Sequence, residues 1–410
     1  MGIFKKTALC TFVSVSLIAC GGGDDAPQTT STPSTGTETG VLTDGAVGGV
    51  SYTTTSGVTG ETDVQGRFKF NKGDKVTFKI GGVTLGGAVN AQATLTPIDL
   101  AGVGANAGVV ANNLLVFLQS LDSDGNHDNG ITILPATVTA AASVTLDFTQ
   151  ATAAFSANSA FTGLIASVSS TGAKLVTPTD AQANFKKAFF ESIQGVWEMG
   201  HTTEKAIVFR FSVHGDYIMG ETGAADASGS SGIEFGKIDW NPLTGVITAT
   251  QTIDTNGHWG LSHPANDKPY KLRLNGNNLV IEESGTSVQG TFTRVTNNNA
   301  SIVGTWALGS ATIFKTQNFT FFDNGYYLLS DTEGDSGCGS PGVEFGKYHL
   351  SGSNLSVTKS EVLFDTNGCA GLADSDAVSS FIFNLNTNDK TAILSSPSEG
   401  GEVTLFRVSL

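Results

Sequence analysis

The feature that most constrains the fold is an internal repeat in the C-terminal half of the chain. Segments 193–297 and 298–410 carry the same motifs in the same order, and the offset between equivalent residues grows only from 109 to 113. Agreement at so many ordered positions indicates that one structural unit occurs twice. The matching stretches are Gly195-Val196-Trp197 with Gly304-Thr305-Trp306, Phe211 to Tyr217 with Phe321 to Tyr327, Gly232 to Lys237 with Gly342 to Lys347, Asp254 to Gly257 with Asp365 to Gly368, and Phe292 to Val295 with Leu405 to Val408.

Each copy opens with Gly-x-Trp and closes with an arginine on its last predicted strand. This resembles the calycin pattern of lipocalins and their relatives, in which the Trp covers one end of a barrel and the Arg packs across it. The resemblance implies the pairs Trp197–Arg294 and Trp306–Arg407, because a guanidinium stacks well on an indole ring. It leaves open whether each repeat is a closed barrel or an open sandwich. We name 193–297 repeat A and 298–410 repeat B.

The repeats also bear on the cysteines. Cys338 corresponds to Ser228 and Cys369 to His258, so repeat B has both thiols and repeat A has neither. Joint presence and joint absence predict a disulfide, which would close a loop of roughly 30 residues and stabilise the fold by about 3 kcal/mol. Two unpaired thiols are the alternative. A disulfide would suit an oxidising compartment.

The N-terminus predicts export. Residues 1–19 contain two lysines, a short apolar run and small residues, in the order of a secretory signal. The run of about a dozen apolar residues is shorter than the roughly 20 that span a bilayer. Leu17-Ile18-Ala19-Cys20 resembles the lipobox of bacterial lipoproteins, which implies acylation of Cys20 and anchoring to a membrane through this lipid. Gly21, rather than Asp, follows the cysteine, and the resemblance then implies the outer membrane. An ordinary signal peptide with a chance cysteine is the alternative.

Residues 20–40 consist largely of Gly, Asp, Pro, Gln, Ser and Thr, which predicts a flexible tether. The segment 41–89 then alternates apolar and polar residues in Arg67 to Phe70 and in Lys75 to Ile80, which predicts half-buried antiparallel strands. Within it, Thr62-Asp63-x-x-Gly66-x-Phe68 resembles the hairpin of carboxypeptidase-regulatory-like and transthyretin-like modules. The resemblance implies a small β-sandwich.

The segment 90–192 has helical patterns. Thr177-Pro178-Thr179-Asp180 is typical of a helix start, with Thr as N-cap and Pro in the first turn. We therefore predict a mainly β protein with a helical middle segment: a small β-sandwich followed by helices and two tandem antiparallel β-barrel or sandwich repeats. Two sets of apolar residues at helical spacing are Val110, Leu114, Phe117, Leu118 and Leu121, and Phe161, Leu164, Ile165 and Val168.

The best candidate metal site is the loop 121–130. Asp122, Asp124, Asn126 and Asp128 offer oxygen ligands at alternate positions, which suits calcium. The loop is not an EF-hand, because His127 stands where that motif needs glycine. Asp, Asn and Gly also form turns, so a solvated loop without metal is the alternative. Calcium is the one cofactor that the sequence suggests.

Signatures of enzymes are missing from the sequence: it has no Gly-x-Ser-x-Gly, no His-Glu-x-x-His, no phosphate loop and no Cys-x-x-Cys. We therefore predict no enzymatic activity. Glu234 with Lys237, and Glu344 with Lys347, could line a binding mouth, but we expect them to be surface charges on strands. The two Asp-Thr-Asn-Gly motifs predict hairpin turns.

These observations favour an envelope lipoprotein that serves as a binding or adhesion-like interaction module toward a protein or a glycan. The alternative is a calycin-type carrier of a small apolar ligand, although the abundant phenylalanine favours an interior filled with side chains. An envelope hydrolase is a third hypothesis. The net charge of −15 disfavours nucleic acid as a partner.

Overall fold

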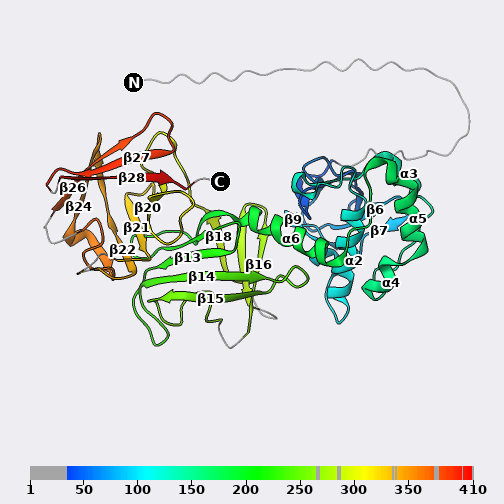
Figure 1. The fold of residues 1–410 in the computed structure, drawn as a ribbon, viewed down its shortest axis with the longest axis horizontal. Coiled ribbons are helices and arrows are strands. Elements are labelled where there is room, and N and C mark those ends of the chain that lie inside the picture. The colour runs from blue at the N-terminus through cyan, green and yellow to red at the C-terminus, as the bar shows by residue number, and fades with distance from the viewer. Residues whose placement is uncertain are drawn as a thin grey trace, which may run out of the picture.

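The computed structural model describes residues 35–264, 268–283, 288–334, 337, 339–373, 378–398 and 400–408. The predicted signal peptide, Cys20 and Cys338 lie outside these residues. The chain is mainly β, and its two repeats form two curled sheets. Figure 1 shows repeat B, repeat A and a unit of N-terminal strands and helices in a row. Within the described residues, no helix is both long and apolar enough to cross a bilayer.

The N-terminal strands form three small sheets. Alternation sets which side chains are buried: Phe68 and Phe70 point inward while Arg67 and Lys69 are exposed. The carboxylate of Asp63 accepts from two main-chain N–H groups of the predicted turn, but the strands on either side of this turn belong to different sheets. The sheets are β5(Arg67–Phe70)-β1(Glu38–Leu42)-β9(Thr94–Leu95), β4(Thr59–Glu61)-β3(Ser51–Thr54)-β6(Lys75–Ile80)-β7(Val83–Thr84) with β8(Val89–Asn90) on β6, and β10(Ile131–Thr132)-β2(Val47–Gly48).

Between these strands and repeat A lie the helices. The Thr177 side chain accepts from the main-chain N–H of Asp180, which is the helix start that the sequence predicted. Strand β10 belongs to the helical segment and pairs in parallel with β2 of the N-terminal strands. This pairing joins the helical segment to the N-terminal strands. The helices are α1(Pro97–Ala101), α2(Ala107–Ser120), η1(His127–Asn129), α3(Pro135–Ala140), α4(Thr152–Ser156), α5(Ser159–Val168), η2(Ser169–Thr171) and α6(Pro178–Ile193).

Repeat A is one antiparallel sheet in which the last strand, β18, lies beside the first, β11. The sheet curls until its two edge strands approach each other at a single bridge between Val246 and Lys271. One contiguous cluster of buried apolar residues extends from the N-terminal strands through the helices into this repeat. The sheet order is β15(Ile247–Asp254)-β14(Gly232–Trp240)-β13(Asp216–Glu221)-β12(Ile207–Phe211)-β11(Gly195–Glu198)-β18(Val288–Arg294)-β17(Asn278–Glu283)-β16(Tyr270–Asn275).

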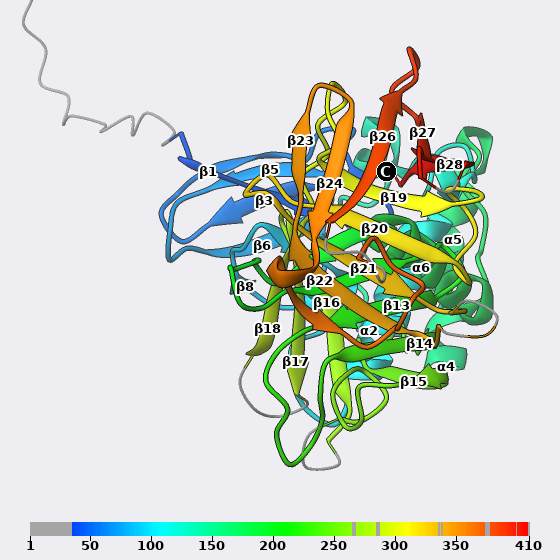
Figure 2. The ribbon, with the colours of Figure 1, turned by 90° about the vertical axis from the view of Figure 1, so that its left-hand side faces the viewer.

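Repeat B has the same organisation with two more strands, and again its last strand lies beside its first. Figure 2 shows the molecule with repeat B toward the viewer. The order is β23(His349–Ser351)-β24(Asn354–Thr358)-β26(Val378–Leu385)-β27(Thr391–Ser396)-β28(Gly401–Arg407)-β19(Gly304–Leu308)-β20(Gln317–Phe321)-β21(Tyr326–Asp331)-β22(Gly342–Lys347)-β25(Val362–Asp365), with η4(Lys359–Glu361) before β25.

The two repeats pack against each other through equivalent strands, β13 and β14 of one against β21 and β22 of the other. Gly220 faces its own counterpart, Ser330, so closely that a Cβ on Gly220 would lie 2.1 Å from the Ser330 hydroxyl. A separate apolar cluster with side chains from both repeats fills this interface. Contact between equivalent positions is the geometry of a two-fold symmetric dimer, here within one chain.

Candidate functional site

The structure brings together each Trp–Arg pair that the repeat motif implied. The guanidinium of Arg294 lies 4.1 Å from the ring centroid of Trp197, and that of Arg407 lies 4.0 Å from Trp306. Each arginine also donates to main-chain carbonyls just before the first strand of its repeat, so the pairs fasten the ends of the sheets. These carbonyls belong to Ser192 and Gln194 in repeat A, and to Ser301 and Val303 in repeat B.

The positions of the predicted disulfide are near each other in both repeats. In repeat A, the main-chain N–H of His258 donates to the carbonyl of Ser228 at 2.7 Å, and these are the counterparts of the cysteines. In repeat B, Gly339 and Gly368, the sequence neighbours of the cysteines, form an isolated β-bridge. Because Cys338 lies outside the described residues, the Cys338–Cys369 bond stays a prediction.

The four proposed calcium ligands have different interaction partners in the structure. Asp122 and Asp124 interact with each other, and one oxygen of Asp122 is buried without a hydrogen-bond partner among the described residues. Asn126 caps η1, and Asp128 accepts from Lys187 on α6 at 2.6 Å. The loop therefore behaves as a set of linked turns, and calcium binding stays a prediction.

The expectation that Glu234 and Glu344 are surface charges is wrong. Both side chains are fully buried. Ile233 and Val343, beside them on the strands, face the other repeat, so the glutamates face the inside of their own sheet. Because the second repeat covers the face of each strand that carries Ile233 or Val343, the opposite face, with the glutamate, lies in the interior of the sheet. Lys237 and Lys347 are exposed.

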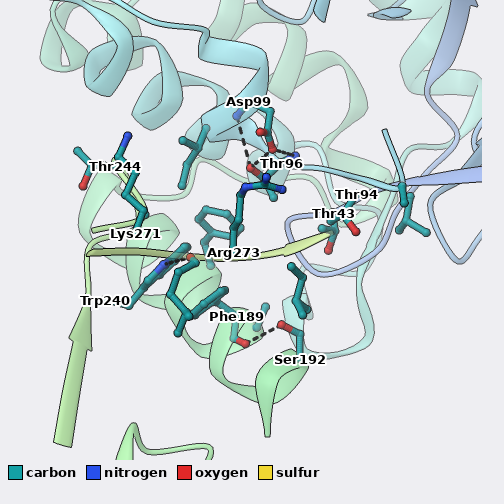
Figure 3. A pocket seen from close by; sticks show the side chains of 18 of the residues that line it. Thr43, Thr94, Thr96, Asp99, Phe189, Ser192, Trp240, Thr244, Lys271 and Arg273 are labelled. Atoms are coloured by element: carbon teal, nitrogen blue, oxygen red, sulfur yellow. Dashed lines mark hydrogen bonds between the residues drawn. The ribbon is translucent and has the colours of Figure 1, made fainter. Parts of the chain in front are cut away.

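A pocket of about 530 Å³ lies where the N-terminal strands, α1 and α6 meet repeat A. Figure 3 shows it from close by. We call it the junction pocket. Its volume falls in the range of small-molecule sites, roughly 300–1,000 Å³. Its walls include Thr43, Thr94, Thr96 and Asp99 from the N-terminal side, Phe185, Phe189 and Ser192 from α6, and Trp240, Thr244, Lys271 and Arg273 from repeat A.

One wall of the junction pocket is aromatic and fixed. Phe189 stacks on Trp240 with ring centroids 4.0 Å apart and planes at 6°, and Phe185 meets the same indole edge-on. The Trp240 indole N–H donates to the carbonyl of Leu272 at 3.0 Å, which sets the plane of the ring. A rigid apolar surface of this kind favours the apolar part of a ligand.

The polar end of the junction pocket centres on Arg273. Its Nε and Nη2 donate to the same oxygen of Glu282 at 2.9 and 2.7 Å. Its Nη1 is buried and has no acceptor among the described residues. In Figure 3 the side chain extends toward Thr96 and Asp99. The carboxylate of Asp99 accepts from the N–H and hydroxyl of Thr96 in the α1 capping box and from the side-chain amide of Gln92.

Sequence reasoning missed this pocket because its residues come from five separate segments of the chain and form no motif. One signal was present in the repeat. Trp240 ends the stretch Gly232 to Trp240, and repeat B has Leu350 at the equivalent position. Trp240 is therefore a difference between the two copies that the sequence alone shows.

Repeat A also contains a smaller cavity, of about 270 Å³, at the mouth of its own sheet. The predicted carrier would use this interior. Phenylalanine and methionine side chains form much of its wall. Its lining includes Met199, Phe209, Met219, Trp259, Leu261 and Phe292.

Comparison with known proteins identifies no family. No family model matches the sequence, and no curated protein matches it. One solved structure with partial similarity is the β subunit of DNA polymerase III from Thermotoga maritima, with 11% identity and a TM-score of 0.11. The match covers 52% of this chain and 55% of that one. Similarity at this level carries no argument about fold or function.

Proposed function

We propose that this chain is a lipid-anchored envelope protein that binds a small amphipathic acid in the junction pocket. The observation that carries the proposal is that Arg273, in the wall of the pocket, has a buried Nη1 without an acceptor among the described residues. The proposal belongs to the binding class predicted from the sequence, with attachment through Cys20 to the outer membrane. It moves the ligand from the calycin-type interior to the junction with the N-terminal strands.

The ligand class follows from the two ends of the pocket. The Trp240–Phe189 wall would take an apolar or aromatic body. Arg273 and Lys271 would take the acidic group: Arg273 has a free donor, and Lys271 has no ion pair among the described residues. A carboxylate is favoured because a guanidinium N–H binds an anion more strongly than a neutral acceptor.

Paired ligands test this proposal. Dodecanoate and dodecanol share an apolar chain and differ in charge, and calorimetry with the full chain would measure both affinities. We expect Arg273→Met to weaken dodecanoate binding by roughly tenfold or more and to change dodecanol binding little, since one charged hydrogen bond is lost. Lys390→Met is the matched control, because Lys390 is an exposed cation in repeat B and the described lining of the junction pocket contains no residue of repeat B. Failure of both ligands to bind, or equal dodecanoate affinity in Arg273→Met, would overturn the proposal.

A further inference from the structure

Two carboxylates face each other inside repeat A. Glu234 on β14 and Asp254 on β15 are direct cross-strand partners, and Glu234 is fully buried. Like charges at directly opposite positions destabilise a sheet unless something lies between them. The Glu234 carboxylate is held in place by the hydroxyl of Tyr217 at 2.6 Å and the main-chain N–H of Leu261 at 2.8 Å.

A histidine completes the group. The Nδ1 of His263 lies 3.8 Å from an oxygen of Glu234 and 3.8 Å from an oxygen of Asp254. All three possible ligand atoms lie within 4.8 Å of one another. The ligand atoms of a tetrahedral zinc ion lie about 3.3 Å apart, given bonds of about 2.0–2.1 Å, so a small inward movement would close the site. The ring of His258 stacks on His263 and limits its rotation.

The second observation is a group of further polar atoms at the same point. The hydroxyl of Ser262 contacts Glu234, the side-chain oxygen of Gln251 at 2.5 Å and the Nδ1 of His263 at 3.1 Å. Each of these oxygen and nitrogen atoms can also coordinate a metal ion.

Comparison of the two repeats distinguishes the residues of this group that belong to the shared fold from those that differ between the copies. Glu344 in repeat B is held in the same way, by the hydroxyl of Tyr327 and the main-chain N–H of Leu372, and it faces Asp365 across the sheet. This arrangement therefore belongs to the fold of both copies. Two of the polar residues occur only in repeat A, because Gln251 and Ser262 stand where repeat B has Val362 and Ala373. The imidazole also occurs only in repeat A, because His263 stands where repeat B has the carboxylate residue Asp374. Asp374 lies outside the described residues.

We propose that Glu234, Asp254 and His263 bind one divalent zinc ion. The donor set, one imidazole and two carboxylates, is one that zinc accepts, and it leaves a fourth position open. The ion would fasten the segment that follows β15 onto the sheet. The same segment supplies His258, Trp259 and Leu261 to the wall of the smaller cavity, so zinc would fix the mouth of that cavity.

Zinc titration of the full chain tests the proposal, with the melting temperature and the stoichiometry as readouts. We expect one equivalent of Zn²⁺ to bind and to raise the melting temperature. His263→Gln should weaken this binding by roughly tenfold or more, since even loss of an outer-shell partner costs about tenfold. His263 is partly exposed, so this variant should fold.

His349→Gln is the matched control, since His349 is an exposed histidine in repeat B that pairs with Glu361. It should bind zinc as the parent does. Cobalt(II) provides a second readout, because the parent should give the visible absorption of a four-coordinate site and His263→Gln should not. The proposal is overturned if the parent binds no zinc, if His263→Gln binds it equally well, or if the loss occurs in His349→Gln.

Discussion

At the scale of single residues, a strong electrostatic perturbation lies at Asp44, in the turn after β1. Its carboxylate is buried, and both oxygens accept from the side-chain amide of Gln119 at 3.1 Å. Burial raises the pKa of Asp44 to about 8, and the bond from Gln119 offsets only part of that effect. In the same network, the imidazole of His127 contacts the main-chain carbonyl of Gln119.

This pKa predicts how stability changes with pH. The folded chain keeps a proton on Asp44 that the unfolded chain loses near pH 4, so this contribution to stability falls as pH rises from about 4 to about 8. Asp44→Asn should remove that decline. Urea unfolding at about pH 5 and about pH 8 would measure it. In the control Asp63→Asn the slope over this window should be unchanged, because the pKa of Asp63 is lowered. A parental slope in Asp44→Asn would contradict the assignment.

The arginines on the last strand of each repeat, Arg294 and Arg407, give a second prediction at the scale of residues. Arg294 combines a stacked indole with two carbonyl acceptors at 2.7 Å, and lysine cannot reproduce this planar geometry. Arg294→Lys should therefore lower the free energy of unfolding by about 1–3 kcal/mol. Arg407→Lys should do the same in repeat B, whereas Arg67→Lys at the exposed surface should change little. An unaltered unfolding midpoint in Arg294→Lys would contradict this role.

At the scale of elements, the features that could be predicted from the sequence are those that short stretches of neighbouring residues determine. The start of α6 at Thr177 and the Trp–Arg pairs follow from short motifs. The environment of Glu234 could not be predicted, because the strand is covered on both sides by segments distant in sequence. The junction pocket could not be predicted for the same reason, because Trp240 and Arg273 meet the N-terminal strands only in the folded chain.

The buried Tyr–Glu bonds give an element-scale prediction. In repeat B, Tyr327 donates to Glu344 and thereby connects β21 to β22 inside the sheet. Tyr327→Phe leaves a buried carboxyl group without one donor and should cost about 1–3 kcal/mol of unfolding free energy. Tyr217→Phe should cost a similar amount in repeat A. Tyr348→Phe is the control, since its hydroxyl meets only a main-chain carbonyl and the residue is half-buried; it should cost less. Equal stability of Tyr327→Phe and the parent would count against the bond.

At the scale of the whole molecule, one contact breaks the two-fold relation of the repeats. Arg210 on β12 is buried and extends from repeat A into repeat B, where it donates to Asn318 and to two main-chain carbonyls. Its counterpart in repeat B is Thr320, which bonds within its own sheet. Burial lowers the pKa of Arg210 to about 10, so the group still carries its charge at neutral pH.

This contact predicts cooperative unfolding of the two repeats. Arg210→Leu would remove three charge-assisted bonds and leave Asn318 and the carbonyls of Ala311 and Ile313 without their donor, at a cost of about 3 kcal/mol. Because the loss is at the interface, each repeat would keep its own core, and calorimetry should resolve two transitions where the parent shows one. Arg67→Leu, which removes an exposed arginine, should keep the single transition. If Arg210→Leu also unfolds in one step at the parental temperature, the apolar interface alone couples the repeats.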